Sequence, residues 1–275
     1  FTIITRNTNK GIKLCNYYKV KYPRLKFLCS NKKILKQKKF DIIDVCTSNN
    51  SHDIYLNYIS KSNSIILVEK PIISLIKFKN NYQKTLNQIY AISNKIVVCY
   101  PMIYLAKSFK KFFNIKKKIN TFDFIFQTGG RYKTKSINID LMPHALSFIS
   151  SFFSKNIFYK KKISIINVEV GKNKWLSQFT LGKIKFTINL NEKIGQKTKL
   201  EVKCNENKIV RITKKYKGNF TNILKYKNKT KIINNPMTEF FKDFKKNKNK
   251  RIFFENNKKI TYQIMKLNSK FLNGY

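Results

Sequence analysis

The sequence predicts an α/β fold in two parts: a doubly wound parallel sheet, then an α+β part with a mostly antiparallel open sheet. Over the first hundred residues, short apolar strands alternate with helices, which is typical of βαβ units. Between residues 163 and 212, strands succeed each other without helices, and 179–189 alternates apolar and polar residues like a half-covered antiparallel sheet. A chain of 275 residues is long enough for two domains, which we expect at 1–101 and 102–275.

The elements follow from apolar runs and from the breaks between them. In the first part, Pro23 ends a helix, because the residue before a proline disfavours helical geometry. The predicted strands there are 1–6, 25–28, 41–46, 65–68 and 95–99, and the predicted helices are 12–22, 33–38, 53–60 and 75–93. The second part has a predicted strand at 119–127, a helix at 143–153, and closing helices at 237–244 and 260–272.

The strand at residues 65–68 ends in a charged pair and a proline. Pro71 cannot donate to a sheet ladder, so Glu69 and Lys70 stand at the carboxyl end of a buried strand. Ligands of open α/β sheets bind at that edge, and desolvation there can make a lysine useful as an acid or base. The alternative is a strand that ends in a solvated salt bridge.

Lysine dominates the charge of the chain. The 58 Lys and Arg residues outnumber 13 Asp and Glu, for a net charge of +45, which ordinarily indicates nucleic acid or an anionic surface. Here lysine is spread along the whole chain with Asn, Ile and Phe, and arginine, the better ligand for phosphates and bases, is scarce. We therefore expect no specific nucleic-acid partner.

Cysteine and histidine use indicates a cytoplasmic protein without a metal. The five cysteines form no Cys-x-x-Cys pair, which fits neither a zinc site nor a disulfide framework, so reduced thiols are the simplest interpretation. Two histidines, His52 and His144, are too few for a His-rich metal site. No apolar run approaches the roughly 18 residues of a membrane span, so we expect no membrane partner.

Three polar motifs follow the predicted strands in order. They are TSNNSH at residues 47–52, Glu69-Lys70-Pro71, and Asp140 with His144 four residues later. Their order and spacing resemble the Gfo/Idh/MocA family of NAD(P)-dependent oxidoreductases, whose signatures are T-P-N-x-x-H, E-K-P and D-x-x-x-H. Ser48 stands where that family usually has proline. The resemblance implies a Rossmann domain followed by an α/β domain built on an open sheet, and it covers essentially the whole chain.

One family feature has no counterpart in this sequence, which contains no Gly-x-Gly-x-x-Gly. The family places that loop after its first strand, where the backbone approaches the pyrophosphate. Residues 1–6 match the second strand of the family, so we expect the Rossmann sheet to be incomplete at its amino-terminal end by roughly the 30-residue scale of a βαβ unit. A fragment of a longer chain and a degenerate member both remain open.

The resemblance implies roles for the motif residues. Lys70 becomes the general acid/base beside the substrate hydroxyl or carbonyl, His144 a second proton-transfer or substrate-binding residue, and Asp140 a residue that binds or orients the substrate. Without a function, His144 would be a core histidine. Asp140 would then be a helix N-cap, since Pro143 suits the first turn of a helix.

The remaining predicted site residues line the strand ends. The cofactor-binding set is Thr5, Arg6, Thr47, Ser48, Asn49, His52, Glu69 and Lys70. Capping of the next helix is the alternative for residues 47–52, and pairing with a neighbouring amine is the alternative for Glu69. We predict that Tyr100, after the strand at 95–99, binds substrate, and that Trp175 serves sheet packing or a subunit contact.

The cofactor predicted is NADP, with NAD as the alternative. The strand at residues 1–6 ends in Thr5-Arg6 without a carboxylate, and an arginine there can pair with a 2′-phosphate. Arg6 as one more surface cation is the competing interpretation.

The activity implied is hydride transfer between NAD(P) and a hydroxyl or carbonyl carbon of a sugar, polyol or related small molecule. The resemblance also implies a homo-oligomer formed through the carboxyl-terminal sheet. The competing hypothesis is a non-catalytic or degenerate Rossmann-type binding protein, which the missing glycine loop favours.

Overall fold

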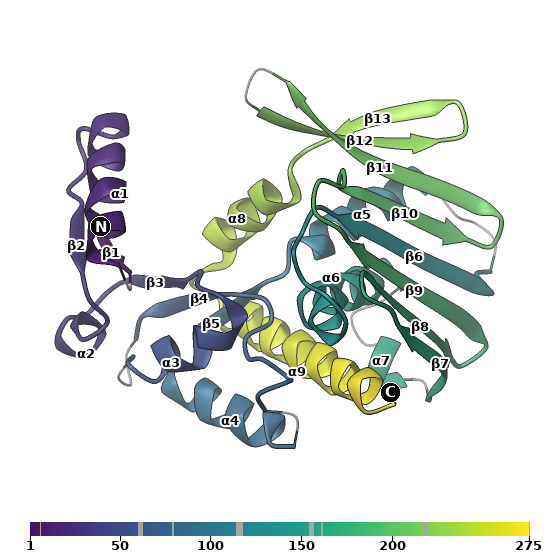
Figure 1. The fold of residues 1–275 in the computed structure, drawn as a ribbon, viewed down its shortest axis with the longest axis horizontal. Helices are drawn as coiled ribbons and strands as arrows, with labels where there is room; N and C mark the ends of the chain where they lie inside the picture. Colours follow the sequence, from purple (N-terminus) through teal and green to yellow (C-terminus); the bar gives the residue numbers. More distant parts are fainter. Residues whose placement is uncertain are drawn as a thin grey trace.

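Five short strands of the amino-terminal part form two parallel sheets in the computed structural model (Figure 1). β1 (Thr2–Ile4) pairs with β2 (Leu28–Ser30), while β3 (Ile42–Val45), β4 (Ile65–Glu69) and β5 (Ile96–Cys99) pair in that order. The structure describes every residue except 6, 60–62, 79, 114–117, 154–156, 161, 217–218 and 275. The predicted parallel pairing is confirmed, but one sheet is replaced by two.

The interruption falls between β1 and β3. A Rossmann sheet has the strand order 3-2-1-4-5-6, so its first strand lies between the second and the fourth. If β1 and β2 are the second and third strands of that order, the break coincides with the place of the first. In the described part of the chain, β1 and β3 each pair along one edge only. Ile42 of β3 is accordingly 41% exposed, whereas Ile66 and Val68 of β4 are fully buried.

Four helices accompany these strands: α1 (Thr8–Lys21), α2 (Ile34–Gln37), α3 (His52–Leu56) and α4 (Tyr82–Ile92). α1 begins four residues before the predicted start, because the Asn7 side chain accepts a hydrogen bond from the backbone N–H of Lys10 and caps it. α4 begins seven residues after its predicted start. Leu75, the predicted first residue of this helix, is instead buried in non-helical chain after Pro71.

The carboxyl-terminal part is built on one eight-stranded sheet. Its order is β13-β12-β11-β10-β6-β9-β8-β7, and every neighbouring pair is antiparallel except β6 and β9. The strands are β6 (Thr121–Thr128), β7 (Ile163–Val170), β8 (Lys174–Leu181), β9 (Ile184–Glu192), β10 (Lys199–Cys204), β11 (Asn207–Tyr216), β12 (Asn219–Tyr226) and β13 (Lys229–Ile233). The open, mostly antiparallel sheet is thereby confirmed.

Helices cover one face of this sheet and leave the other open (Figure 1). They are α5 (Met102–Phe113), α6 (Lys135–Phe153) and the short α7 (Ile157–Lys160). Aromatic rings fill the space between, and Phe148 of α6 packs against Phe122 and Phe124 of β6. Trp175 is fully buried and bonds Ser177 through its indole nitrogen at 2.7 Å. Through this packing, α6 is held against the covered face of the sheet.

The last two helices, α8 (Pro236–Asn247) and α9 (Arg251–Asn273), return to the amino-terminal strands. Phe240 and Phe244 of α8 cover the face of β4 and β5 that carries Leu67 and Val97. Asn257 of α9 bonds both the N–H and the carbonyl of Val98, at 2.8 and 2.9 Å, and so occupies the outer edge of β5. The division at residue 101 stays a prediction. No helix in the described part of the chain is long and apolar enough to cross a membrane.

Candidate functional site

Lys70 and Asp140 meet where the two parts of the chain join. The Lys70 ammonium donates to the Asp140 carboxylate at 2.7 Å and to the Asp140 backbone carbonyl at 2.9 Å. The Lys70 side chain is 10% exposed and that of Asp140 26%. A charge pair so largely withdrawn from water needs hydrogen bonds on both partners, and here the ammonium has two. Two residues that are 70 positions apart thus form one ion pair at the carboxyl end of β4.

A proline lies inside α6, one turn from the second of these bonds. The sequence predicted a helix that starts at Pro143 with Asp140 as its cap, but α6 starts at Lys135 and Asp140 lies in its second turn. Pro143 has no N–H for the Ile139 carbonyl and its ring crowds that carbonyl, so the helical ladder is interrupted here. The Asp140 carbonyl bonds Lys70 at the same turn. The capping role is therefore wrong, and the Asp140 carbonyl that Lys70 bonds lies next to the Ile139 carbonyl that the proline leaves without its helical donor.

His144 lies one helical turn after Asp140 on the same face of α6. Its ring packs edge-on against Phe126 of β6, with centroids 5.8 Å apart. Nδ1 is buried without a hydrogen-bond partner, while the residue keeps partial exposure. Burial lowers the pKa of His144 well below its usual value, and the positive charges of Lys70 and Arg211 lower it further. A neutral imidazole at this position can accept or donate one proton.

His52 connects two of the motifs. Its Nδ1 lies 2.9 Å from the Pro71 carbonyl oxygen, and its Nε2 lies 2.9 Å from that of Thr47. The residue is 1% exposed, so the ring has no free nitrogen to offer a cofactor. His52 thus links the loop after β3 to the loop after β4. The sequence had predicted a direct contact with the cofactor instead.

The other predicted cofactor residues follow the carboxyl ends of β1, β3 and β4. The Thr47 hydroxyl is buried without a partner, and exposed Ser48 bonds Ser51 through its hydroxyl at 2.8 Å. Asn49 opens the short 3-10 turn Asn49–Ser51 before α3, and the Thr5 hydroxyl donates to the Asn7 carbonyl at 2.6 Å. These positions share the edge at which an open α/β sheet binds its ligand. Arg6 lies outside the described residues.

Glu69 is the acid of the same edge. Burial raises its pKa, and the positive charge of Lys70 and the backbone N–H of that residue act in the opposite direction. The residue is partly buried and directly precedes the Lys70–Asp140 ion pair. Both the predicted cofactor contact and the predicted pairing with an amine remain compatible with this place.

Tyr100 is not at the site surface. It is 1% exposed and belongs to the main hydrophobic core, and burial raises the pKa of its hydroxyl. Because β5 ends at Cys99, Tyr100 turns inward before α5 rather than toward the strand ends. The predicted substrate contact of Tyr100 stays a prediction, and the burial of this residue does not favour it.

Glu192, at the end of β9, is a site residue that the sequence analysis missed. It is 2% exposed, and one of its carboxylate oxygens is buried without a partner. Burial raises the pKa of Glu192, the backbone N–H of Tyr132 lowers it, and the negative charge of Asp140 raises it. A Cβ at Gly130 would overlap the Glu192 carboxylate, so the glycine admits the loop over it. In the sequence, the Gly129-Gly130 pair was the one sign of a close approach here. The pairing of β6 with β9 is what places these glycines beside Glu192.

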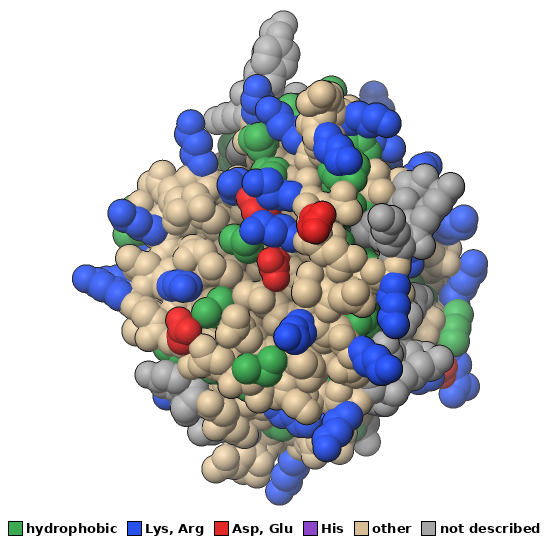
Figure 2. Space-filling model, turned by 90° about the vertical axis from the view of Figure 1, so that its right-hand side faces the viewer, with side chains coloured by type: hydrophobic (Ala, Val, Ile, Leu, Met, Phe, Trp, Pro, Cys, Tyr) green, Lys and Arg blue, Asp and Glu red, His purple; other side chains and the backbone are tan. Residues whose placement is uncertain are grey.

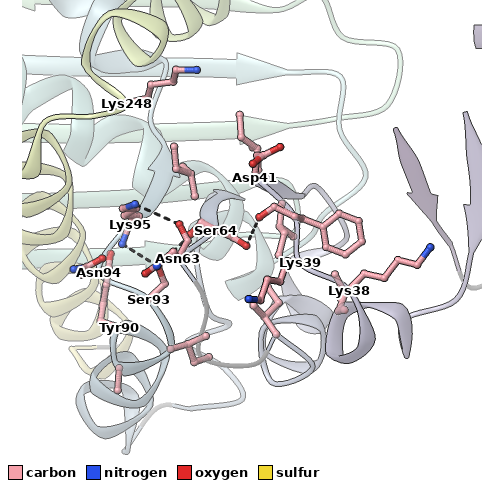
Figure 3. A pocket seen from close by; sticks show the side chains of 18 of the residues that line it. Lys38, Lys39, Asp41, Asn63, Ser64, Tyr90, Ser93, Asn94, Lys95 and Lys248 are labelled. Atoms are coloured by element: carbon pink, nitrogen blue, oxygen red, sulfur yellow. Dashed lines mark hydrogen bonds between the residues drawn. The ribbon is translucent and has the colours of Figure 1, made fainter. Parts of the chain in front are cut away.

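A large cavity of the described structure lies elsewhere. It measures about 1140 Å³ and lies at the amino ends of β3, β4 and β5, lined by Asp41, Ser64 and Lys95 among others. Figure 3 shows several of its polar groups bonding one another, as when the Ser93 hydroxyl donates to the Ser64 carbonyl at 3.2 Å. Parallel sheets bind ligands at the opposite ends of their strands, so we do not place the site here.

The donor set of the site suits organic ligands rather than a metal. No group of three or more His, Cys, Asp or Glu side chains among the described residues could hold a metal ion. For a dinucleotide, the unpaired Thr47 hydroxyl and the desolvated Glu69 fit the polar ends of the molecule. The pyrophosphate fits less well, because the sheet is interrupted where its glycine-rich loop would stand.

Comparison with known proteins gives a match in structure but not in sequence. No family model matches the chain, and no curated protein matches it. Among solved structures, the 3-ketoreductase KijD10 from Actinomadura kijaniata, in complex with TDP-benzene and NADP, is 8% identical, with a TM-score of 0.66 over 94% of this chain and 85% of that chain.

Two further structures are similar over almost the whole chain. A dehydrogenase (MviM) from Clostridium difficile is 13% identical, with a TM-score of 0.65 over 99% of this chain and 89% of that chain. The oxidoreductase yvaA from Bacillus subtilis is 11% identical, with a TM-score of 0.63 over 98% and 88%. The fold that the three motifs led us to expect is thus confirmed: this chain shares the fold of a 3-ketoreductase, a dehydrogenase and an oxidoreductase.

Proposed function

We propose that the protein is an NADP-dependent oxidoreductase that transfers a hydride between the nicotinamide and a hydroxyl or carbonyl carbon of a sugar, a polyol or a related molecule. The observation that carries the proposal is the Lys70–Asp140 ion pair at the carboxyl end of β4, with His144 one turn further along α6. The similar ketoreductase from Actinomadura kijaniata, described with NADP and TDP-benzene, supports this substrate class and cofactor.

Lys70 is the proton donor in this proposal. In the reductive direction, the bound cofactor supplies hydride to the carbonyl carbon, and Lys70 Nζ gives a proton to the carbonyl oxygen, which becomes a hydroxyl. The Asp140 carboxylate and carbonyl fix the direction of the ammonium. His144, kept neutral by burial, donates to or accepts from a neighbouring substrate hydroxyl. His52 positions Lys70 by holding the Pro71 carbonyl.

The cofactor contacts proposed are Thr5, Arg6, Thr47, Ser48, Asn49, Glu69 and Lys70. NADP is preferred to NAD because Thr5-Arg6 follows β1 without a carboxylate that would repel a 2′-phosphate. The alternative function, a non-catalytic or degenerate binding protein, is favoured by the lack of a glycine-rich loop in the sequence. It predicts no NADPH-dependent turnover of any keto-sugar.

The test is NADPH oxidation with a panel of keto-sugars at saturating cofactor. We expect Lys70→Ala to lower kcat by about 10² to 10⁴, because a positioned general acid contributes that much. Lys77→Ala is the matched control, since this lysine also pairs with an acid, Asp53, but with 45% of its side chain exposed. Full activity of a folded Lys70→Ala protein contradicts the role of Lys70, and absence of turnover in the unaltered protein favours the alternative.

The proposal includes a homo-oligomer formed through the open face of the eight-stranded sheet. In the middle of that face, uncharged side chains alternate with the buried residues of β8 and β9, among them Gln178, Thr180, Thr187 and Asn189. Figure 2, which views the molecule from the side of this sheet, shows Lys and Arg spread over the surface rather than gathered in one block. That distribution supports the absence of a specific nucleic-acid partner. All five cysteines are described and free, which supports a cytoplasmic location.

A further inference from the structure

Arg211 of β11 is a largely buried cation on the covered face of the eight-stranded sheet. It lies opposite Leu224 on one side and Leu200 on the other, and Leu200 in turn lies opposite Phe126, so the four residues form one row. Residues directly opposite one another share a face of the sheet, and both leucines are fully buried. Arg211 therefore points toward α6, into the row whose Phe126 ring contacts His144.

No anion accompanies this guanidinium in the described part of the chain. Arg211 forms no ion pair there, and its Nε is buried without a partner. Burial alone lowers the pKa of Arg211 to about 10, which leaves it charged at neutral pH. A buried charge without an opposite charge is unfavourable, so the position requires an explanation. The chain contains only five arginines, and the other described ones, Arg24, Arg131 and Arg251, are exposed.

The guanidinium is held in place by a short chain of hydrogen bonds. Its Nη2 donates to the Thr213 hydroxyl at 3.0 Å, and that hydroxyl donates to the Asn222 side-chain oxygen at 3.1 Å. Asn222 is 3% exposed. These contacts fix one edge of the planar fork and leave Nε free. An arginine held in this way can bind a carboxylate or a phosphate through two parallel hydrogen bonds, which a lysine cannot do.

The free guanidinium and the proposed catalytic residues belong to the same region. The positive charges of Lys70 and Arg211 both lower the pKa of His144, so both cations lie near this residue. At the end of the same face, β6 and β9 place Thr128 beside Glu192, whose neighbours include Asp140. The polar groups of this region thus surround the end of α6 that carries Asp140 and His144.

We propose that Arg211 binds an anionic group of the substrate, a carboxylate or a phosphate oxygen, and so selects charged sugars over neutral ones. That the bound anion is part of the substrate rests on the proposed function. The binding of the anion itself needs neither cofactor nor turnover. The shared chemistry is an oxyanion that accepts from Nε and an Nη of the guanidinium. Its source is the carboxylate of a uronic acid or the phosphate of a sugar phosphate or nucleotide sugar.

The experiment measures equilibrium binding of four probes, glucose, glucuronate, glucose 6-phosphate and UDP-glucose, by titration calorimetry on the full chain. We expect at least one charged probe to bind at least tenfold more tightly than glucose. Arg211→Met should weaken binding of that probe by about 10- to 150-fold, the value of a hydrogen-bonded charged group, and leave glucose unchanged. The probe that responds identifies the source of the oxyanion.

Two further variants make the result specific. Lys208→Met, on the same strand but exposed, removes the same charge and should leave all four affinities unchanged. Arg211→Lys keeps the charge without the planar fork and should lose part of the preference. If Arg211→Met fails to fold, Arg211→Lys carries the test alone, and its unchanged preference would overturn the proposal.

The outcomes separate this inference from the proposed function. Equal binding of charged and neutral probes by the unaltered protein overturns the anion site, even if NADPH-dependent turnover is found. Loss of NADPH affinity in Arg211→Met, with the probe preference retained, assigns the guanidinium to the cofactor and also overturns it. Arg211-dependent binding of a charged probe without turnover supports the anion site and contradicts the enzyme.

Discussion

The amino-terminal sheets and the carboxyl-terminal sheet differ in how completely they are built. The eight strands of the second are continuous, whereas the first is divided between β1 and β3. The substrate side of the proposed site therefore lies on a continuous sheet and on the helix packed against it. Its residues are Asp140, His144, Glu192 and Arg211. On the cofactor side, polar residues follow the carboxyl ends of the strands. However, β1 and β3 each have one edge without a partner strand in the described chain.

This difference separates two requirements of the same reaction. Proton transfer depends on a lysine held at a fixed place, and two hydrogen bonds to Asp140 supply that. Dinucleotide binding depends on backbone N–H groups that face a pyrophosphate, and these come from a glycine-rich turn after the first strand. The described residues supply the first requirement, while residues 1–275 contain no Gly-x-Gly-x-x-Gly for the second.

The largest predicted effect comes from adding a glycine-rich turn to the chain. A strand, a Gly-x-Gly-x-x-Gly loop and a helix, joined ahead of Phe1, should raise NADP affinity by two orders of magnitude or more. Two or three hydrogen bonds from backbone N–H groups to the charged pyrophosphate are worth about 1.5 to 3 kcal/mol each. Titration calorimetry on the extended and the unaltered chain measures the effect. An extension with the three glycines replaced by alanine is the control, and equal tight binding by all three proteins would show that the interruption is not the pyrophosphate site.

The local features of the site could be predicted from the sequence, and its assembly could not. An apolar run ending at Pro71 predicts the place of Lys70, because proline stops a ladder wherever the strand packs. The start of α6 was misplaced since Pro143 suits a first turn but is tolerated inside a helix that tertiary packing supports. The burial of Tyr100 could not be predicted, because the direction of a side chain after a strand depends on the helix that follows.

Glu192 and Arg211, which the sequence did not indicate, are brought to the site by the register of strand pairing. Glu192 reaches the site through the parallel pairing of β9 with β6, and Arg211 through the pairing of β11 with β10. A shift of one residue in either pairing would turn these side chains to the opposite face. Such registers are set by the whole sheet, and alternation along a single strand cannot supply them. For the same reason, one glutamate among 13 acids carried no signal by itself.

A second prediction compares the covered edge of β5 with the open edge of β3. Asn257→Leu removes both hydrogen bonds to Val98 and should lower the free energy of unfolding by about 1 to 3 kcal/mol, because two backbone groups lose their partners. Chemical denaturation followed by circular dichroism measures the loss. Asn256→Leu, at the neighbouring position of α9, is the control and should change stability less. An unaffected Asn257→Leu protein would mean that the edge of β5 needs no cover, and the two edges would then be equivalent.

The smallest predicted effect concerns the free energy of unfolding below neutral pH. It arises in the carboxyl-terminal part of the chain. His144 has a folded pKa well below its unfolded value near 6.5, as burial and the charges of Lys70 and Arg211 require. Below that unfolded value the unfolded chain binds more protons than the folded one, so stability falls as the pH decreases from about 6.5 toward the folded pKa. The slope contributed by one such proton is at most about 1.4 kcal/mol per pH unit. Denaturation at several pH values between 7.5 and 5 should therefore show a shallower decline for His144→Leu than for the unaltered protein.

Glu192 supplies the opposite sign in the same region. Its folded pKa is raised, so the folded protein binds more protons than the unfolded chain above about pH 4.5, and stability is lost as the pH rises through the folded pKa. In Glu192→Gln this loss should disappear, while the decline due to His144 should remain. Parallel profiles for the unaltered protein and His144→Leu would show that His144 is not withdrawn from water, and the closed environment assigned to the substrate side would then be wrong.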